Sequence, residues 1–307
     1  MLQSKFDLLA IVGPTASGKT QLAVHLAAKL NGEVISADSR QVYRGMNIGT
    51  GKDLEDYFVD GRQIPYHLID IVEAGYRFNV FEYQQHFIDA YNDIKNRNHL
   101  PVLCGGSGLY IDAVLRGYKL LPVPENPELR GKLDAKTDEE LTAILASYKD
   151  LHNTTDLDTR KRTIRAIEIE DFYSRQPTDP KPFPLIKSVV FGVKYQRATE
   201  MRRIKERLAQ RLDSGMIDEV RALLDSGLSA DDLIYYGLEY KYITEYLLGK
   251  YSYDEMFERL YIAIRQFAKR QMTWFRGMER KGFTIHWIPG ETSLEGKIDL
   301  VIRKIYE

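Results

Sequence analysis

The sequence has a single cysteine and no long apolar run, and each scarcity excludes a class of protein. One thiol, Cys104, cannot form a disulfide within the chain, which excludes a disulfide-stapled secreted domain and fits a reducing cytosol. The longest apolar run near the start, residues 8–12, is far too short for the core of a signal peptide or for a transmembrane helix. We therefore expect a soluble, cytoplasmic protein without a membrane partner.

An excess of charge of either sign is also missing. The formal net charge is −1 over 307 residues, so the overall charge predicts no nucleic-acid partner, although a local basic face is enough to bind a polyanion. Internal repeats and low-complexity segments are absent as well. A composition with 44% hydrophobic and 28% charged residues is ordinary for a globular protein, and the length predicts one large domain with a smaller one inserted or appended.

Strand-like and helix-like patterns alternate along the first third of the chain. Short apolar runs bounded by turn residues indicate strands, and apolar positions at helical spacing indicate helices. Alternation of this kind predicts an α/β fold in which helices flank both faces of a parallel sheet. The expected strands are residues 6–12, 33–37, 67–72 and 100–104, and the expected helices are residues 18–30, 80–96 and 108–115.

The pattern changes after Gly117. Prolines gather in two clusters between residues 120 and 184, with charged helical runs between them and no convincing strand, which predicts a small helical insertion. Beyond it, residues 187–193 return to the sheet, and apolar positions over residues 201–212 predict an amphipathic helix that bends at Gly215. The remaining expected elements are two or three helices within residues 232–278, a strand at 283–288 and a C-terminal helix.

These patterns divide the chain into three parts, which we expect to form one monomer. The core begins in the first part, the helical insertion follows, and the third part completes the core and adds C-terminal helices. The parts are residues 1–118, 119–185 and 186–307.

A glycine-rich stretch lies between the first expected strand and the first expected helix. It fits the pattern G-x-x-x-x-G-K-[ST] at every fixed position, and its strand-to-helix context makes the match specific to a P-loop NTPase-like fold. Such a turn closes backbone N–H groups around an anion at a helix N-terminus, where the helix dipole also favours negative charge. Lys19 is expected to reach the terminal phosphates and Thr20 to bind Mg²⁺. The predicted phosphate-binding residues are Gly13, Pro14, Thr15, Ala16, Ser17, Gly18, Lys19 and Thr20.

An acidic residue, Asp38, follows the second expected strand. Parallel sheets build their sites beyond the carboxyl ends of the strands, so a carboxylate here can ligate Mg²⁺ or accept a proton from a substrate. It can equally cap a turn or a helix, because Asp and Ser are common caps. The spacing alone does not decide between these roles.

Six segments, taken in order, resemble the tRNA dimethylallyltransferases, also called tRNA isopentenyltransferases. They span residues 13–276, nearly the whole chain, and the block around Asp38 is highly characteristic of that family. The resemblance implies an enzyme that moves a five-carbon allylic group from dimethylallyl diphosphate to N6 of the adenine adjacent to the anticodon in tRNA. The segments are GPTASGKT, ISADSRQVYRGMNIGTGK, HLIDI, PVLCGGSGLYIDAVL, RKRTIRAIEI and AKRQMTWFR.

The resemblance gives the phosphate loop a task other than phosphate transfer. The loop would hold the diphosphate of the donor, which is the leaving group, and Lys19, Thr20 and Mg²⁺ would stabilise the charge that grows as the C–O bond breaks. An exocyclic adenine amine is a poor nucleophile and has to lose a proton, so a carboxylate within hydrogen-bond reach serves as the base. By resemblance this base is Asp38, and Ser39, Arg40 and Gln41 contact the target base and its neighbours.

Two further residues take catalytic roles by resemblance, beside Asp38. Ser107 stands where the family commonly has threonine, and its hydroxyl keeps the suggested contact with a diphosphate or substrate oxygen; it can also cap the helix that begins near Gly108. Arg207 matches the family arginine thought to help bind the diphosphate. It lies beside the apolar stripe of its helix, so periodicity allows an inward-pointing or a solvated head, and Arg203 shares that ambiguity.

The resemblance also implies several segments that contact tRNA. A charge run on a helix is usually only a solvated face, so the residues alone do not predict these contacts. The approach to one of the segments, LHNTTDLDT, lacks the proline usual in the family, which leaves its geometry open. The implied tRNA-binding residues are Asp38, Ser39, Arg40, Gln41, Ser107, Arg130, Lys161, Arg162, Thr163, Ile164, Arg165, Gly237, Lys241, Lys269, Arg270 and Arg276.

Of these residues, Lys269 and Arg276 belong to a basic stripe near the C-terminus, and Arg270 lies beside it. Cations recur at spacings of 4, 7 and 4 from Arg265 to Arg280, with Trp274 and Phe275 between them. Looped-out RNA is recognised by stacking and phosphate contacts, for which such a surface is suited. The alternative, which periodicity alone favours, places the aromatic residues in the core and the cations on a solvated face. His67 is expected to be structural, because nothing in the reaction requires it.

Two other functions stay open at this point. An adenylate isopentenyltransferase would use the same donor with free AMP, ADP or ATP as acceptor, but it would not need the basic C-terminal helices. A small-molecule kinase would use the phosphate loop to bind ATP; no arginine-rich lid closely follows the sheet, although residues 161–165 can imitate one. The favoured hypothesis is transfer to the anticodon stem-loop of tRNA, with Mg²⁺ as cofactor.

Overall fold

The structure, a computed structural model, describes residues 6–151, 154–175 and 183–307. The chain forms two compact units, of which the first comprises Met1–Tyr118 and Pro184–Glu307 and the second Lys119–Phe183. The second proline cluster of the expected insertion falls almost entirely on residues 177–182, outside the described residues.

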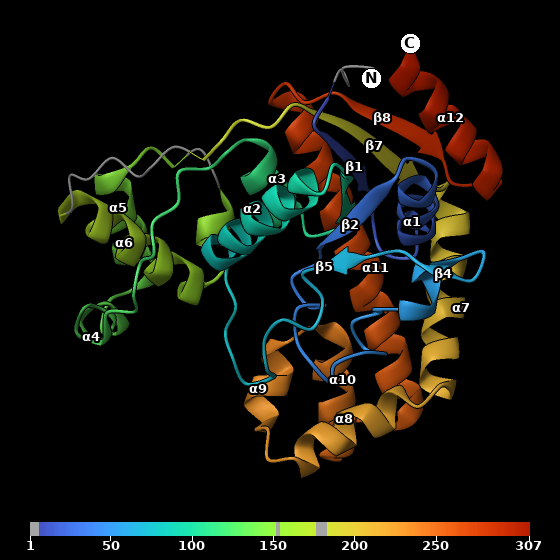
Figure 1. Ribbon diagram of the computed structural model, residues 1–307. Helices are drawn as coiled ribbons and strands as arrows, with labels where there is room; N and C mark the ends of the chain where they lie inside the picture. The colour runs from blue at the N-terminus through green and yellow to red at the C-terminus, as the bar shows by residue number, and fades with distance from the viewer. Residues whose placement is uncertain (1–5, 152–153, 176–182) are drawn as a thin grey trace. The chain divides into compact units, whose positions relative to one another are not determined.

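A six-stranded parallel sheet forms the centre of the first unit (Figure 1). Its strand order is β5-β2-β6-β1-β7-β8, and β1 pairs with β6 on one side and with β7 on the other. All five residues of β1 are fully buried, because helices cover both faces of a parallel sheet. The strands are β1 (Leu8–Val12), β2 (Gly32–Ala37), β5 (Tyr66–His67), β6 (Leu100–Gly105), β7 (Ser188–Lys194) and β8 (Ile285–Pro289), and a separate hairpin joins β3 (Phe58–Val59) to β4 (Arg62–Gln63).

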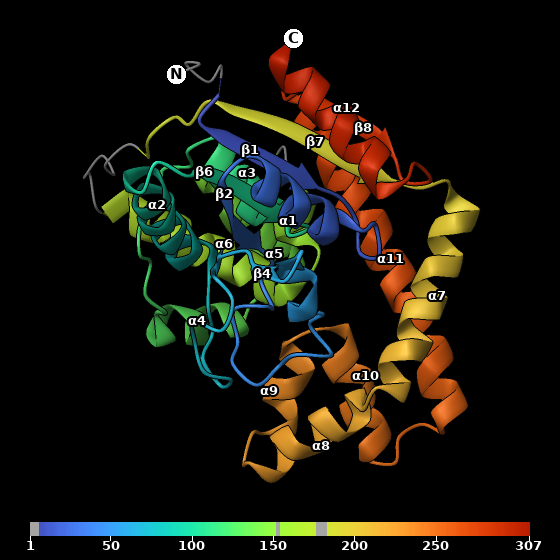
Figure 2. The same cartoon turned by 45° about the vertical axis from the view of Figure 1, so that its right-hand side comes forward.

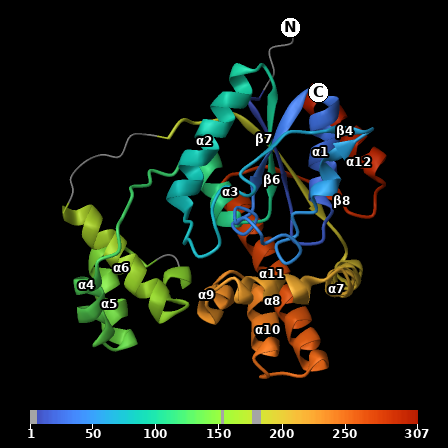
Figure 3. The same ribbon diagram turned by 60° about the horizontal axis from the view of Figure 1, so that its bottom comes forward.

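Helices cover the two faces of this sheet (Figure 3). On one face, Leu22 and Ile298 from two helices join Leu9 and Ile11 of β1 in one apolar cluster. On the other face, a helix begins at a capping box in which Asn79 and Glu82 satisfy free N–H groups. The first face carries α1 (Lys19–Lys29) and α12 (Leu294–Tyr306), and the second carries α2 (Val80–Asn96) and α3 (Gly108–Leu115).

A second group of helices gathers mainly below the sheet in Figures 1 and 2, and α11 continues from this group up behind the sheet. The longest, α11, has 28 residues, begins at a capping box made by Ser252 and Glu255, and packs against α7, α10 and α3. Among the described residues, neither α11 nor any other helix is long and apolar enough to cross a membrane. The group consists of α7 (Arg197–Asp213), α8 (Met216–Asp225), α9 (Ala230–Tyr235), α10 (Leu238–Leu247) and α11 (Tyr253–Arg280).

The second unit is helical throughout its described residues. Leu133, Leu141, Leu145, Ile164 and Ile167 are buried together and form its core. The unit is small, so this single cluster supplies most of its apolar burial. Its helices are α4 (Pro127–Asp134), α5 (Asp138–Tyr148) and α6 (Arg160–Arg175), with a short 3-10 helix at Thr154–Leu157.

The predicted fold class is confirmed, but two local predictions are wrong. The expected strand over residues 67–72 is reduced to the two residues of β5, because Leu68 and Asp70 adopt φ angles of +63° and +56°, which a strand does not accommodate. The helix expected to bend at Gly215 ends there instead, because Gly215 has a φ of +95° and separates α7 from α8. Both breaks come from left-handed backbone conformations, at two residues in the first case and one in the second, that periodicity does not reveal.

Candidate active site

The phosphate loop joins β1 to α1 through two left-handed residues. Ala16 has a φ of +60° and Gly18 a φ of +77°, and a Cβ added to Gly18 would meet open space, so glycine is required there by backbone conformation rather than by crowding. No side chain caps the first N–H groups of α1, and the buried hydroxyl of Ser17 has no hydrogen-bond partner among the described residues. The loop therefore presents unmet donors at a helix N-terminus, which suits an anion.

One side chain of α11 holds this loop. Gln271 is 7% exposed; its Oε1 accepts a hydrogen bond from Thr15 N at 2.9 Å, and its Nε2 donates to the carbonyl of Gly106 at 2.9 Å. A Cβ on Gly106 would lie 2.4 Å from Nε2, so glycine makes room for the contact. Gln271 ties the ends of β1 and β6 together. The sequence analysis missed it, because a single glutamine on an amphipathic helix belongs to no motif.

Arginines of α7 approach the same loop from the other side. Arg203 Nε donates to the carbonyl of Ala16 at 3.0 Å. Arg207 Nη2 lies 2.7 Å from the carboxylate of Asp53, which Arg211 shares at 3.2 Å. Helical periodicity did not decide whether the guanidinium groups of Arg203 and Arg207 point inward. In the structure both point toward the loop.

The half-buried ammonium of Lys19 has no anionic partner among the described residues. Its Nζ makes one hydrogen bond within the described residues, to the carbonyl of Pro14 at 3.3 Å. Burial lowers the pKa of Lys19; Cys104 and Asp38 oppose this effect, and the charge of Arg207 adds to it. An anion bound in the loop would relieve that cost and favour the charged amine.

Asp38 and Ser107 lie at the ends of the neighbouring strands β2 and β6. Asp38 Oδ1 accepts a hydrogen bond from Arg40 N at 2.8 Å, so the carboxylate shapes its own turn, while its Oδ2 receives no hydrogen bond from the described residues. Ser107 Oγ accepts from Ser39 N at 3.0 Å and does not cap α3 with its side chain. The backbone N–H of Ser107 donates to Ala37 O at 3.1 Å, which locks the two strand ends together.

Internal hydrogen bonds fix the segment that follows Asp38. Gln41 accepts from the Ser36 hydroxyl at 2.8 Å and donates to the carbonyl of Gly51 at 2.9 Å, so its side chain is engaged within the protein. Lys52 is 1% exposed and pairs with Asp70. The lysine stabilises the two left-handed residues around Asp70 that interrupt the expected strand.

The same segment is held by a carboxylate of α8. Glu219 accepts hydrogen bonds from the N–H groups of Asn47, Ile48 and Gly49 at 2.8, 2.7 and 3.0 Å. The hydroxyl of Tyr240 donates to it as well, at 2.7 Å. Three consecutive N–H groups on one carboxylate make this turn rigid, which in turn positions the residues after β2.

A second carboxylate faces the arginines of α7 and was not predicted. Glu239 of α10 lines a small cavity together with Arg207 and Arg211. Burial raises the pKa of Glu239, and the charges of the two arginines offset part of that rise. Within GLEYK the sequence analysis named only Gly237, which begins α10 with a φ of +144°, and Lys241, which is half-buried.

The basic stripe of α11 is exposed, but its aromatic residues are packed. Lys269, Arg270 and Arg276 carry no ion pair among the described residues. Phe275 is fully buried, and Trp274 packs so closely on the start of α3 that a Cβ on Gly108 would lie 2.4 Å from its ring. The three cations therefore lie on an exposed face of α11, whereas Phe275 belongs to the interior and Trp274 is partly buried against α3.

The predicted tRNA-binding residues of the second unit divide into two groups. Thr163 and Ile164 are buried, and Arg165 pairs with the buried Glu168, which Arg130 also contacts at 2.9 Å. These four side chains serve the unit's own packing. The exposed members of the set are Lys161 and Arg162, the latter paired with Asp158 at 2.9 Å.

Residues 41–278 match the family model described as IPP transferase. The chain belongs to the IPP transferase family. The tRNA dimethylallyltransferase 2 of Bacteroides fragilis strain YCH46 is 62% identical over 307 residues, which cover all of both chains. The full-length tRNA isopentenylpyrophosphate transferase of Bacillus halodurans is 33% identical, covers 98% of this chain and 96% of that one, and superposes with a TM-score of 0.71.

A more distant structure agrees in fold alone. A eukaryotic dimethylallyltransferase that acts on tRNA is 21% identical, covers 92% of this chain and 73% of that one, and gives a TM-score of 0.75. The IPP transferase match begins at Gln41, after the phosphate loop and Asp38, but the relative from Bacteroides fragilis spans both. The family assignment therefore covers the whole site.

Proposed function

We propose that the protein transfers a dimethylallyl group from dimethylallyl diphosphate to N6 of the adenine adjacent to the anticodon in tRNA. The observation that carries this proposal is the meeting of three strand ends. The phosphate loop follows β1, Asp38 follows β2, and Ser107 follows β6. An anion site and a carboxylate with a free oxygen at one edge of a sheet suit the departure of a diphosphate and the removal of a proton.

The donor's diphosphate binds at the start of α1. The N–H groups of the loop, the ammonium of Lys19 and the guanidinium of Arg207 surround it, and Ser17 supplies the unpartnered hydroxyl. Thr15 N is not among these donors, because it already donates to Gln271. Negative charge on the leaving oxygens grows as the C–O bond breaks, so fixed cations stabilise the transition state more than the ground state.

Asp38 accepts the proton of the adenine amine. The nitrogen forms a bond to the allylic carbon, the C–O bond to the diphosphate breaks, and the amine proton passes to the carboxylate. Oδ1 is held by Arg40 N, which leaves Oδ2 to face the substrate. Ser107, linked to Ser39, keeps this turn in place and offers its hydroxyl to a substrate oxygen.

The residues at the loop fit a magnesium ion that a diphosphate helps to hold. Within the described residues, no group of three or more His, Cys, Asp or Glu side chains can hold a metal ion by themselves. Mg²⁺ commonly binds through one or two protein oxygens, substrate phosphates and water, and the hydroxyl of Thr20 supplies an oxygen of this kind. When bound, the ion would neutralise charge on the leaving diphosphate.

The acceptor is tRNA, held by cations outside the site. Support comes from the exposed, unpaired Lys269, Arg270 and Arg276 on α11, which a free adenylate would not require. We place the reaction in the cytoplasm, which suits the single reduced thiol, and assign it to a monomer, which gel filtration checks.

The test is incubation with radiolabelled dimethylallyl diphosphate, Mg²⁺ and either unmodified tRNA, an anticodon stem-loop or AMP. Label in the tRNA and in the stem-loop, and none in AMP at the same concentration, is expected. Efficient labelling of AMP would assign the protein to the adenylate enzymes instead. Hydrolysis or transfer of the γ-phosphate of ATP to a small molecule, without prenylation, would indicate the kinase.

A further inference from the structure

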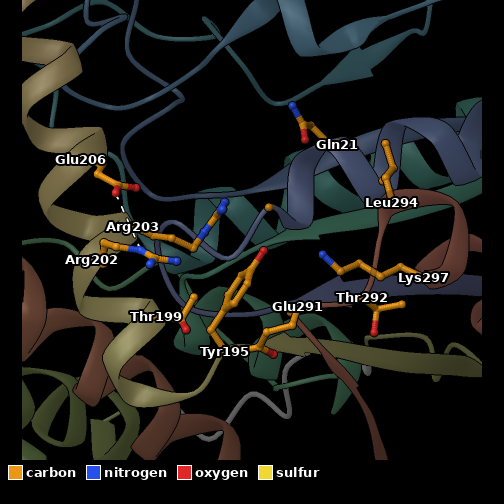
Figure 4. A pocket seen from close by; sticks show the side chains of 12 residues that line it. Gln21, Tyr195, Thr199, Arg202, Arg203, Glu206, Glu291, Thr292, Leu294 and Lys297 are labelled. Carbon is orange, nitrogen blue, oxygen red and sulfur yellow. Dashed lines mark ion pairs between the residues drawn. The ribbon is translucent and has the colours of Figure 1, made fainter.

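A cleft of about 480 Å³ opens beside the phosphate loop (Figure 4). Its walls come from Gly18 and Gln21 at the start of α1, from the first turns of α7, from the turn Gly290–Thr292 after β8, and from Lys297 of α12. None of the side chains proposed to carry out the transfer lines it. The cleft thus shares one glycine with the donor site but has its own set of charged groups.

Lys297 is the most unusual of these groups. The residue is only 7% exposed, and its ammonium has no hydrogen bond and no ion pair within the described part of the chain. The centroid of the Tyr195 ring lies 5.5 Å from its Nζ. Burial and the charge of Arg203 lower the pKa of Lys297, whereas Glu291 opposes them. Figure 4 shows the ammonium directed into the cleft.

Tyr195 and the arginines complete a cationic wall. The guanidinium of Arg203 lies 4.6 Å from the centroid of the Tyr195 ring, and that ring packs on Gly290, where a Cβ would lie 2.5 Å away. Arg202 is exposed and meets Glu206 only at 3.8 Å. Tyr195 thus packs against Gly290 and lies beside two cations.

The two carboxylates of the cleft do not cancel this charge. Glu291 accepts a hydrogen bond from Gln196 N at 3.0 Å and is thereby held at the N-terminus of α7, and Glu206 is engaged with Arg202. Three cations therefore face two carboxylates, and the cation with the least access to water is the unpaired one. Lys297 thus buries its stem and presents its ammonium to the cleft without a partner among the described residues, which suits pairing with a bound anion.

We propose that this cleft binds a small phosphate-bearing anion at a site separate from that of the donor's diphosphate. Lys297 and Arg203 would pair with its oxygens, and Arg202 would close its open side. A free small anion is favoured over an RNA phosphate, because Lys297 is recessed and a backbone diester cannot enter without burying its neighbours. Arg203 also donates to Ala16 O, so an anion in the cleft would share a guanidinium with the phosphate loop.

Inorganic diphosphate is the probe, because it is small enough for both sites. Calorimetric titration of the full chain is expected to show two bound diphosphates. Lys297→Met should abolish one of them, or weaken it at least tenfold, and leave the other unchanged; Lys19→Ala should do the reverse. Arg202→Gln, at an exposed position that does not threaten folding, should weaken the same site as Lys297→Met by a few fold. Lys304→Met is the matched control, since this exposed lysine of α12 already pairs with Glu307 at 3.0 Å.

Thermal denaturation shows whether Lys297→Met is folded. Without anion the variant should melt close to the wild-type temperature, because the ammonium that it lacks makes no hydrogen bond or ion pair within the described residues and methionine keeps most of the buried stem. A single diphosphate per wild-type chain, abolished by Lys19→Ala and unaffected by Lys297→Met and Arg202→Gln, would overturn the proposal. Unchanged diphosphate binding together with a loss of tRNA affinity in Lys297→Met would overturn it too, by assigning the lysine to the RNA backbone.

Discussion

The backbone N–H of Thr15 donates a hydrogen bond to the side chain of Gln271 over 2.9 Å, although 256 positions separate the two residues in the sequence. The phosphate loop is therefore not shaped by its own motif alone. A helix near the other end of the chain takes up one of its N–H groups and ties it to the end of β6 through Gly106. Any change at Gln271 should reach the donor site without touching the donor.

Replacing Gln271 with alanine should loosen the phosphate loop. The change leaves Thr15 N and the carbonyl of Gly106 without partners, so the free energy of unfolding should fall by about 1–3 kcal/mol and the KM for the donor should rise more than kcat falls. Urea denaturation and steady-state kinetics measure the two effects. Gln266→Ala, at an exposed position of the same helix, is the control and should change stability by less than about 0.5 kcal/mol. Identical curves for both variants would show that Gln271 does not hold the loop.

Asp38→Asn should lower turnover and keep both substrates bound. The amide oxygen can still accept from Arg40 N and preserve the turn, but the group no longer takes up a proton, so the rate should fall by roughly 10²–10⁴. Single-turnover labelling of tRNA measures the rate, and filter binding measures affinity. Asp38→Ala removes the turn as well and should also weaken binding. If asparagine supports nearly the wild-type rate, the carboxylate only shapes the turn.

Removing a cation of α11 should weaken tRNA binding and leave donor binding intact. Lys269→Ala and Arg276→Ala should each lower tRNA affinity uniformly across sequences and reduce the slope of log K against log [salt] by about 1. Titrations at several salt concentrations give the slope, and donor binding by calorimetry should be unchanged. Arg303→Ala, at an exposed position of α12, should leave the slope as it is. Equal slopes in all four proteins would remove this surface from the tRNA site.

Acid should destabilise the protein through Glu33, which lies in β2 away from the reaction. Burial acts to raise the pKa of Glu33, but hydrogen bonds from Arg97, His67 and His99 outweigh it and lower the pKa to about 2. A lowered folded-state pKa stabilises the protein above the ordinary value near 4.5, and this contribution is lost as pH falls from about 4.5 to about 2. The loss should reach about 3 kcal/mol at most.

Denaturation with urea between pH 2 and pH 7 measures this contribution of Glu33. Glu33→Gln should be less stable at neutral pH and should show a weaker dependence on pH in that window than the wild type, because other paired carboxylates such as Asp53 and Glu168 still titrate there. Glu55→Gln, an exposed carboxylate, should follow the wild-type curve. A wild-type stability that is flat between pH 4.5 and pH 2 would contradict the pairing.

Sequence reasoning found what depends on local pattern and missed what depends on distant contacts. A motif marks Lys19 as a predicted site residue; a strand end makes Asp38 a candidate, and only the family resemblance gave it the role of base. Glu239 and Gln271 were not identified, because their roles arise from helices folded against the loop, and no spacing in the sequence encodes that approach. The directions of the arginine guanidinium groups on α7 could not be predicted either. Helical periodicity tells which face of a helix a residue lies on, but not where the end of a long flexible side chain points.

Residues with left-handed backbone conformations limited the prediction of the fold in a similar way. The apolar residues 67–72 fit a strand by composition, yet Leu68 and Asp70 are left-handed. The buried Lys52 pairs with Asp70 and supports that conformation. This tertiary interaction cannot be predicted from the sequence of either segment. The fold class survived these errors, because it rests on the alternation of many elements.

The position of the insertion delays completion of the sheet during synthesis. Residues up to Tyr118 contain β5, β2, β6 and β1, but the other neighbour of β1 does not begin until Ser188. Until then, one edge of an entirely apolar strand carries unpaired N–H and C=O groups, which invite pairing with other chains. The insertion, Lys119–Phe183, takes roughly 3–13 s to translate at about 5–20 residues per second. Each nascent chain therefore passes through an interval of several seconds in which it depends on shielding by the ribosome or a chaperone.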